Sequence, residues 1–291
     1  MHLAERAHAL GSLSPGDIAG IRRVMAGLAL DPRPVVDTEL VAVQTPTVRG
    51  TWTVPKGADP QRRILYCHGG SFAFGDAPLY AGLTSRIGQR SRSCVFFADY
   101  RLAPEHPFPA AHDDCHAALH YVATTGPAGA ERAHTLFTAG DSSGANLAIS
   151  AALAGMGAGL AINGVLALSP FVDLAVHGES WTVNRTRDPV LSEEAARGCA
   201  TGYAPGMDPR DPRLSALFAD LTPIPRLQIQ GSMADPLRDD AVRLAIAAHA
   251  VGVPTTLHLW PDLPHAWYLF AAQLADAARG VELAADFLRQ Q

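Results

Sequence analysis

The chain is poor in charged residues and has no cluster of basic ones. Only 18% of its 291 residues are charged, and the formal net charge at pH 7 is −5. Without a block of Lys and Arg it lacks the electrostatic footprint of proteins that bind nucleic acid or anionic membranes. Hydrophobic residues make up 48% of the sequence. This composition excludes global disorder and predicts a large buried core.

Cysteine is scarce, and no two cysteines form a CxxC pair. A chain of this length does not depend on disulfide bonds, so we interpret the thiols as free. No secretory signal is evident, because Glu5 comes early and no clean apolar segment with a cleavage site follows. We therefore expect a cytoplasmic protein. The four cysteines are Cys67, Cys94, Cys115 and Cys199.

One segment, residues 147–172, is nearly free of charge and is long enough to suggest a membrane span. Several glycines, Asn163 and Pro170 interrupt it. A buried helix, a glycine-rich turn and a buried parallel strand explain this pattern better. We therefore predict no membrane span.

Short apolar segments alternate with amphipathic ones through most of the chain. Strands that alternate with helices form a parallel sheet covered on both faces, so the predicted fold class is α/β. Such sheets bind ligands beyond the carboxyl ends of their strands. The expected strands are residues 63–67, 94–98, 135–139, 164–168, 226–230 and 255–260, with one or two more in 40–54. The expected helices are residues 14–30, 79–89, 110–124, 143–153, 237–250 and 268–289.

Residues 175–225 break this alternation. They contain many prolines, several Arg/Asp pairs and Trp181, but no clear strand. We interpret this segment as a helical cap inserted into a single domain of residues 1–291. Residues 1–35 are expected to join the cap in space.

The strongest chemical signal is the GDSSG motif at residues 140–144. It follows an expected strand and precedes an expected helix, which is the context of a nucleophile elbow. Such a turn strains the backbone of its central serine and requires small neighbours. The hydroxyl then projects above the sheet, and the N–H groups that begin the next helix point at the site. The context predicts Ser142 as a nucleophile instead of a surface serine in a tight glycine turn.

Ser142 needs a base, because a serine hydroxyl is a weak nucleophile at its ordinary pKa. Where such an elbow occurs, the chain order of the triad is serine, acid, histidine. Asp235 and His265 each follow an expected strand, so both lie on the sheet edge that carries Ser142. We predict His265 as the general base and Asp235 as the acid that orients it. Asp262 is the competing acid.

A glycine-rich turn, HGGSF at residues 68–72, follows another expected strand. Acyl transfer builds negative charge on a carbonyl oxygen, and donors must be aimed at that position in advance. Consecutive glycines let backbone N–H groups approach the substrate closely. His68 is interpreted as a structural residue that braces this turn. The expected oxyanion-hole donors are the N–H groups of Gly69, Gly70, Ser71 and Ser143.

These segments together resemble the hormone-sensitive lipase family of α/β-hydrolases. The matching motifs are HGGSF at 68–72, DYRLAPE at 99–105, GDSSG at 140–144, SPFVDL at 169–174, DPL at 235–237 and the loop around His265. The resemblance implies an α/β-hydrolase fold, with a mostly parallel central sheet flanked by helices and a small helical cap. It also implies carboxylesterase activity on short to medium acyl esters and no cofactor. Bacterial relatives include lactone hydrolases, and many form dimers, so a homodimer is expected too.

Two positions depart from the family pattern. Ser71 stands where the family usually has a third glycine, and Ser143 where it usually has an alanine. Both still donate a backbone N–H group. The side chain of Ser71 adds a hydroxyl group and bulk beside the reacting carbonyl, so either change is expected to narrow or polarise the pocket.

Weaker signals concern the pocket and a metal. Core packing explains each aromatic pocket candidate equally well or better. His112 and His116 have a spacing that can bind zinc on a helix, but no third ligand is identifiable. We interpret them as a solvated helix face and predict no metal. The pocket candidates are Phe72, Phe74, Trp181 and Trp267.

The predicted function is two-step acyl transfer by a serine carboxylester hydrolase. One alternative keeps the same triad and changes the substrate to a lactone or an amide-like metabolite. A second alternative is a ligand receptor on an inactive hydrolase scaffold. The presence of His265 argues against that receptor, because loss of the histidine is what would favour it.

Overall fold

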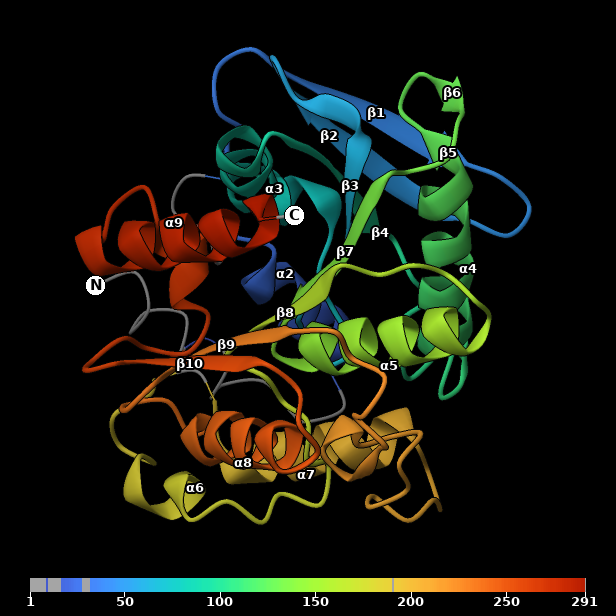
Figure 1. Ribbon diagram of the computed structural model, residues 1–291. Coiled ribbons are helices and arrows are strands. Elements are labelled where there is room, and N and C mark those ends of the chain that lie inside the picture. The colour runs from blue at the N-terminus through green and yellow to red at the C-terminus, as the bar shows by residue number, and fades with distance from the viewer. Residues whose placement is uncertain (1–8, 10–16, 28–31, 190, 291) are drawn as a thin grey trace.

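A β-sheet with helices on both faces forms the centre of the molecule (Figure 1). The computed structural model describes residues 9, 17–27, 32–189 and 191–290. In these residues the sheet has eight strands, in the order β1-β2-β4-β3-β7-β8-β9-β10. β2 (Arg49–Pro55) pairs antiparallel with both β1 (Thr38–Gln44) and β4. The other neighbouring strands pair in parallel.

The central strands are buried along their whole length, as expected for a sheet covered on both faces. Every residue of β4, β7, β8 and β9 is buried, whereas the edge strand β10 is mostly half-buried. A separate two-stranded ribbon joins β5 (Thr125–Gly126) to β6 (Gly129–Ala130). The parallel strands are β3 (Asp59–Cys67), β4 (Ser93–Ala98), β7 (Thr135–Asp141), β8 (Gly164–Leu168), β9 (Leu227–Ser232) and β10 (Thr255–Trp260).

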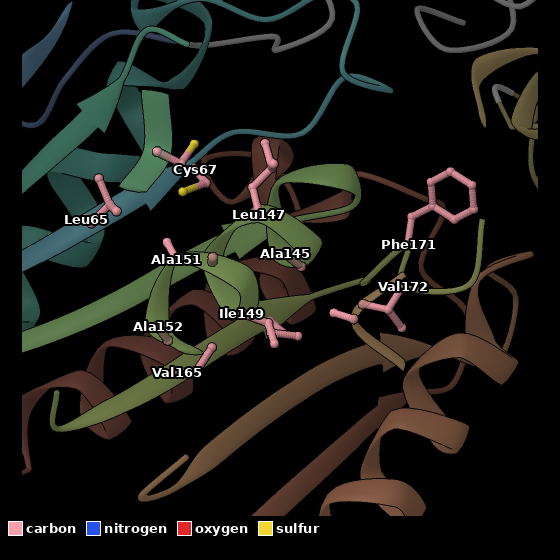
Figure 2. Close-up of a cluster of buried hydrophobic side chains, with 14 of the residues drawn as sticks. Leu65, Cys67, Ala145, Leu147, Ile149, Ala151, Ala152, Val165, Phe171 and Val172 are labelled. Carbon is pink, nitrogen blue, oxygen red and sulfur yellow. The ribbon is translucent and has the colours of Figure 1, made fainter. Parts of the chain in front are cut away.

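Two hydrophobic cores lie on opposite faces of this sheet. α3 (Ala77–Ser91) and α9 (Ala275–Arg289) cover one face. α4 (Ala110–Thr124), α5 (Ser143–Gly157) and α8 (Arg238–Ala250) cover the other. The helix α5 is apolar on nearly every side, which is typical of a helix buried in a core. Figure 2 shows its Leu147 and Ala151 beside Leu65 and Cys67 of β3.

The predicted rhythm of strands and helices is confirmed, and residues 40–54 form two strands. The expected helix 268–289 starts later than predicted, at Ala275. Residues Trp267–Phe270 form a 3-10 turn whose four side chains are all buried. The N–H of Leu269 donates to the carbonyl of Ala266 three residues earlier, and Leu274, whose backbone is extended, separates this turn from α9. Of the expected helix 14–30, α2 (Ile18–Met25) is present, and residues 14–16 and 28–30 lie outside the described residues.

The uncharged segment 147–172 consists of most of α5, a turn and β8, as predicted. No helix in the described part of the chain is long and apolar enough to cross a membrane. Between β8 and β9, residues 175–189 and 191–225 hold α6 (Ser180–Val183), α7 (Glu193–Tyr203) and the 3-10 turn η1 (Ala216–Phe218), and they add no strand. The N–H of Ser180, the first residue of α6, donates to Asp239 of α8 at 2.8 Å, and the two helices lie close together in Figure 1.

Candidate active site

Ser142 occupies the sharp turn between β7 and α5. Its backbone has φ 50° and ψ −124°, a strained conformation for a residue with a side chain. The neighbouring strand holds this turn, because the Ser142 N–H donates to the carbonyl of Leu168 at 2.9 Å. The N–H of Phe171 donates to the Ser142 carbonyl at 3.0 Å. The elbow predicted from GDSSG is therefore present as a backbone structure.

The two glycines of the elbow are required by close packing. A Cβ atom on Gly140 would lie 2.3 Å from the carbonyl oxygen of Gly144. A Cβ atom on Gly144 would lie 2.1 Å from the carbonyl oxygen of Cys67 in β3. Both obstacles are backbone atoms, which cannot move aside as the end of a side chain can. The turn can approach β3 this closely only with glycine at both positions.

The structure brings the predicted serine, histidine and acid into one hydrogen-bonded chain. His265 Nε2 lies 3.1 Å from Ser142 Oγ, and His265 Nδ1 lies 3.0 Å from Asp235 Oδ2. Asp235 is 1% exposed, whereas the side chain of the competing acid Asp262 is 80% exposed. Asp262 pairs instead with Arg187 at 2.8 Å. The geometry is that of a base oriented by a buried carboxylate.

Nearby carboxylates control the proton affinity of His265. Burial lowers the pKa of His265, but the carboxylates of Asp235, Asp188 and Asp141 raise it, and the result is a pKa of about 9. An imidazole that already carries a proton cannot accept another. The base therefore becomes available as pH rises toward 9, and we expect kcat/KM to rise in the same range.

The glycine-rich turn supplies unused N–H donors beside Ser142. Among the described residues, the N–H groups of Gly70, Ser71 and Ser143 have no hydrogen-bond acceptor in the protein. The N–H group of Gly69 differs from these three. It donates to Asp141 Oδ1 at 2.9 Å and to Tyr80 Oη at 3.1 Å, so it is already occupied. Three of the four expected donors thus remain available for an oxyanion.

The same turn is strained and is held by its neighbours. Gly70, Ser71 and Phe72 all have positive φ, at 113°, 55° and 58°. The Phe72 N–H donates to Ser143 Oγ at 3.2 Å, so the side chain of Ser143 links this turn to α5. From α7, the Cys199 thiol donates to the Ser71 carbonyl at 2.9 Å, and the ring of Tyr203 stacks on Phe72 at 3.8 Å.

Asp141, the acidic residue of the GDSSG motif, connects the glycine-rich turn to neighbouring elements through hydrogen bonds. It is 1% exposed and accepts hydrogen bonds from the hydroxyls of Tyr66 at 2.9 Å and Tyr80 at 2.8 Å. Burial raises the pKa of Asp141, and hydrogen bonds from tyrosines and from Gly69 oppose that rise. The carboxylate thereby ties the glycine-rich turn to α3. This contact was not anticipated from the sequence, because it joins residues far apart in the chain.

The aromatic pocket candidates lie in different surroundings. Phe72 and Trp181 are both buried, and Trp181 packs edge-on against Phe171 at 6.3 Å. Trp267 fills the core between β10 and α9, where a Cβ atom on Gly280 would lie 2.5 Å from its ring. Phe74 is half-buried beside the same core. The contacts of Trp267 match the core-packing alternative most closely.

The interpretation of His112 and His116 as a solvated helix face is wrong. His112 is 4% exposed, with Nδ1 2.6 Å from the hydroxyl of Tyr203, because α7 packs over this part of α4. His116 Nε2 lies 3.2 Å from Ser150 Oγ on α5. Burial lowers the pKa of His112 to about 3. Within the described residues, no cluster of three or more His, Cys, Asp or Glu side chains could hold a metal ion.

Two residues at the site were missed by sequence reasoning. Asp188 Oδ2 accepts the backbone N–H of His265 at 2.5 Å. Asn184 Nδ2 donates to the carbonyls of Met233 and Asp235, both at 2.9 Å. Both residues come from the segment between α6 and α7. No local motif marks them, since their partners lie between 49 and 77 positions away in the chain.

Comparison with known proteins identifies the family of this chain. The family described as alpha/beta hydrolase fold matches residues 64–269. An acetyl-hydrolase of Streptomyces hygroscopicus is 38% identical over 240 residues, which cover 82% of this chain and 78% of that protein. The chain belongs to the α/β-hydrolase fold family, as predicted.

Solved structures narrow the relationship. An esterase from the bacterial hormone-sensitive lipase family superposes with a TM-score of 0.90 at 31% identity, covering 100% of this chain and 95% of that one. A hormone-sensitive lipase from a metagenome library superposes with a TM-score of 0.85 at 29% identity, covering 98% and 96%. The chain is thus a carboxylester hydrolase of the hormone-sensitive lipase family.

Proposed function

We propose that this chain hydrolyses short to medium acyl esters, with Ser142 as nucleophile, His265 as general base and Asp235 as the orienting acid. The observation that carries the proposal is the hydrogen-bonded chain of these three side chains, at 3.1 Å and 3.0 Å. Unused N–H donors flank it.

The first half of the reaction forms an acyl-enzyme. Ser142 Oγ attacks the ester carbonyl carbon, and its proton passes to His265 Nε2. The carbonyl oxygen becomes an oxyanion, which accepts hydrogen bonds from the N–H groups of Gly70, Ser71 and Ser143. When the carbonyl forms again, the bond to the alcohol oxygen breaks. The leaving alcohol takes its proton from His265.

The second half releases the acid. Water attacks the acyl carbon while His265 Nε2 takes one of its protons. Through the same oxyanion, the bond between the acyl carbon and Ser142 Oγ then breaks. The proton returns to Ser142, and the carboxylic acid leaves. Asp235 accepts the hydrogen bond from Nδ1 throughout and stabilises the positive imidazolium in both halves.

The cover over the site supports small acyl groups. Ser142 is 7% exposed and His265 is 8% exposed. The cap that we propose consists of residues 175–225, joined by the N-terminal residues 1–35. Within the described part of the latter, Arg22 of α2 donates to the carbonyl of Ala73 at 2.8 Å, just after the glycine-rich turn. The similarity to an acetyl-hydrolase supports the same size range.

Two further features remain parts of this proposal. The four free thiols support a reducing, cytoplasmic environment, because cysteines stay unpaired where the compartment keeps thiols reduced. The family resemblance supports a homodimer. Sedimentation of the purified protein at several concentrations measures its oligomeric state directly.

The test compares wild type with Ser142→Ala on p-nitrophenyl esters of increasing acyl length and on lactones of increasing ring size. We expect turnover of the acetyl and butyryl esters, and a loss of about 10⁶-fold in kcat for the variant. An unchanged thermal melt shows that the variant is folded. A fluorophosphonate probe should label the wild type alone. Full activity of the variant would exclude this serine, and a preference for lactones would replace open-chain esters as the substrate.

A further inference from the structure

The segment of residues 184–188, between α6 and α7, touches both loops that carry the histidine and the acid. Asn184 is fully buried, and its amide nitrogen donates to the carbonyls of Met233 and Asp235. Asp188 Oδ2 accepts the backbone N–H of His265. The segment therefore connects the loop after β9 to the loop after β10 through side chains of the proposed cap.

The loop that carries His265 depends on contacts from outside its own strand. It follows β10, the edge strand of the sheet, so only β9 pairs with that strand. The residue after the histidine, Ala266, has φ 61°, which is strained for a residue with a Cβ atom. A strained turn persists only where its surroundings hold it. The Asp188 carboxylate is the acceptor for the main-chain N–H directly before this strained residue.

Asp188 is itself held in place. It is 6% exposed, and its second oxygen, Oδ1, accepts the N–H of Leu191 at 2.8 Å. A buried carboxylate is stable only when its oxygens accept hydrogen bonds. One oxygen accepts an N–H group within the proposed cap segment, and the other accepts the backbone N–H of His265. The side chain therefore links the cap segment to the loop that carries His265.

We propose that Asp188 is a positioning residue that fixes the orientation of His265 from the cap. The proposal rests on the function proposed above, because it concerns the same base. Its main contribution is to hold the imidazole in line with Ser142. Its negative charge also lies beside His265 and raises the pKa of that imidazole.

The charge effect has a definite sign. Three carboxylates face His265: Asp235 from the loop after β9, Asp188 from the cap segment and Asp141 from the end of β7. Each favours the protonated imidazole and raises the pKa of His265. Removal of the Asp188 charge therefore lowers that pKa. The base then becomes available at lower pH, and the acid limb of kcat/KM moves to lower pH.

Two variants separate the two effects. Asp188→Asn removes the charge and keeps one acceptor oxygen, which can serve the His265 N–H while the N–H of Leu191 loses its acceptor. We expect its acid limb to shift down by about half a pH unit or more, with plateau kcat within about threefold of wild type. Asp188→Ala removes the acceptor too. We expect its kcat to fall about 10- to 100-fold with little change in KM, because a misplaced base slows the chemical step.

A matched control removes a charge elsewhere in the same cap. Asp220 is exposed, and its carboxylate accepts the N–H of Thr222 within its own turn. Asp220→Asn should leave kcat, KM and the pH profile unchanged. Thermal melts of all variants show whether each is folded.

Two outcomes would overturn the proposal. One is an Asp188→Ala protein that is folded and has wild-type kcat and pH profile. The other, decisive if Asp188→Ala does not fold, is an Asp188→Asn protein whose acid limb does not move. Failure of the proposed function looks different, because Ser142→Ala would then keep its activity whatever the Asp188 variants do.

Discussion

The proposed nucleophile and the proposed base of this enzyme are held in place in different ways. Ser142 lies between a central strand and a buried helix, and close backbone packing of Gly140 and Gly144 fixes its turn. His265 lies on a loop beyond the edge strand, where polar side chains hold it. The core thus positions the nucleophile through shape, whereas long-range hydrogen bonds position the base and its acid.

The difference explains why one half of the site is easier to alter than the other. Backbone packing tolerates almost no added volume, because the atoms in the way cannot move. A hydrogen bond can be removed one partner at a time, and its loss changes orientation more than fold. We therefore expect substitutions of the elbow glycines to affect stability first and substitutions near the proposed base to affect rate first.

The largest effect expected on the base side comes from its acid. Asp235→Asn should lower kcat by about 10⁴-fold, because the imidazole loses the carboxylate that orients it and stabilises its charge. Asp262→Asn changes the rival acid, which is exposed and paired with Arg187, and should change kcat by less than about threefold. Steady-state kinetics on p-nitrophenyl acetate measure both. The reverse order of effects would make Asp262 the orienting acid.

On the nucleophile side, the packing of the elbow should appear as stability. Gly144→Ala places a Cβ atom 2.1 Å from the Cys67 carbonyl oxygen, and we expect it to destabilise the fold by about 3 kcal/mol or more. Gly157→Ala, at the other end of α5, has no atom within 4 Å of the added Cβ. It should stabilise by up to about 1 kcal/mol, since alanine favours a helix. Denaturant unfolding compares them, and equal stabilities would remove the distinction between the two regions.

The smallest effect concerns the hydrogen bond between the elbow and the glycine-rich turn. Ser143→Ala leaves the Phe72 N–H without its acceptor, and we expect kcat to fall about 3- to 10-fold with KM nearly unchanged. Ser150→Ala removes a hydroxyl from the same helix that contacts His116 instead. That variant should keep wild-type kcat. A Ser143→Ala protein with full activity would show that the turn holds its shape without this hydroxyl.

Much of the fold was predictable from the sequence, because its signals are local. The buried strand β8 is a continuous run of apolar residues, and the elbow has a motif whose glycines are explained by contacts within a few ångströms. The helix expected from residue 268 was misplaced, since apolar side chains in Trp267–Phe270 suggested a helix face but are buried on all sides. Periodicity cannot distinguish these cases before the neighbouring β10 and α9 are known.

The residues that hold the base were not predictable in the same way. Asn184 and Asp188 lie in a region without strand or motif, and each acts through a partner far away in the chain. The order serine, acid, histidine located Asp235 and His265 because every strand of a parallel sheet ends at the same edge. No such rule relates the segment between α6 and α7 to that edge, so its contacts become visible only in the three-dimensional structure.

The proposed cap segment also bears on how the enzyme would distinguish one ester from another. A bulky acyl or alcohol group has to displace part of the cover over Ser142, which is only 7% exposed. Residues 184–188 are hydrogen-bonded to both triad loops, so moving them would disturb catalytic geometry along with fit. Large esters would then be bound but turned over slowly. Compared with small esters, they would show a lower kcat with little change in KM.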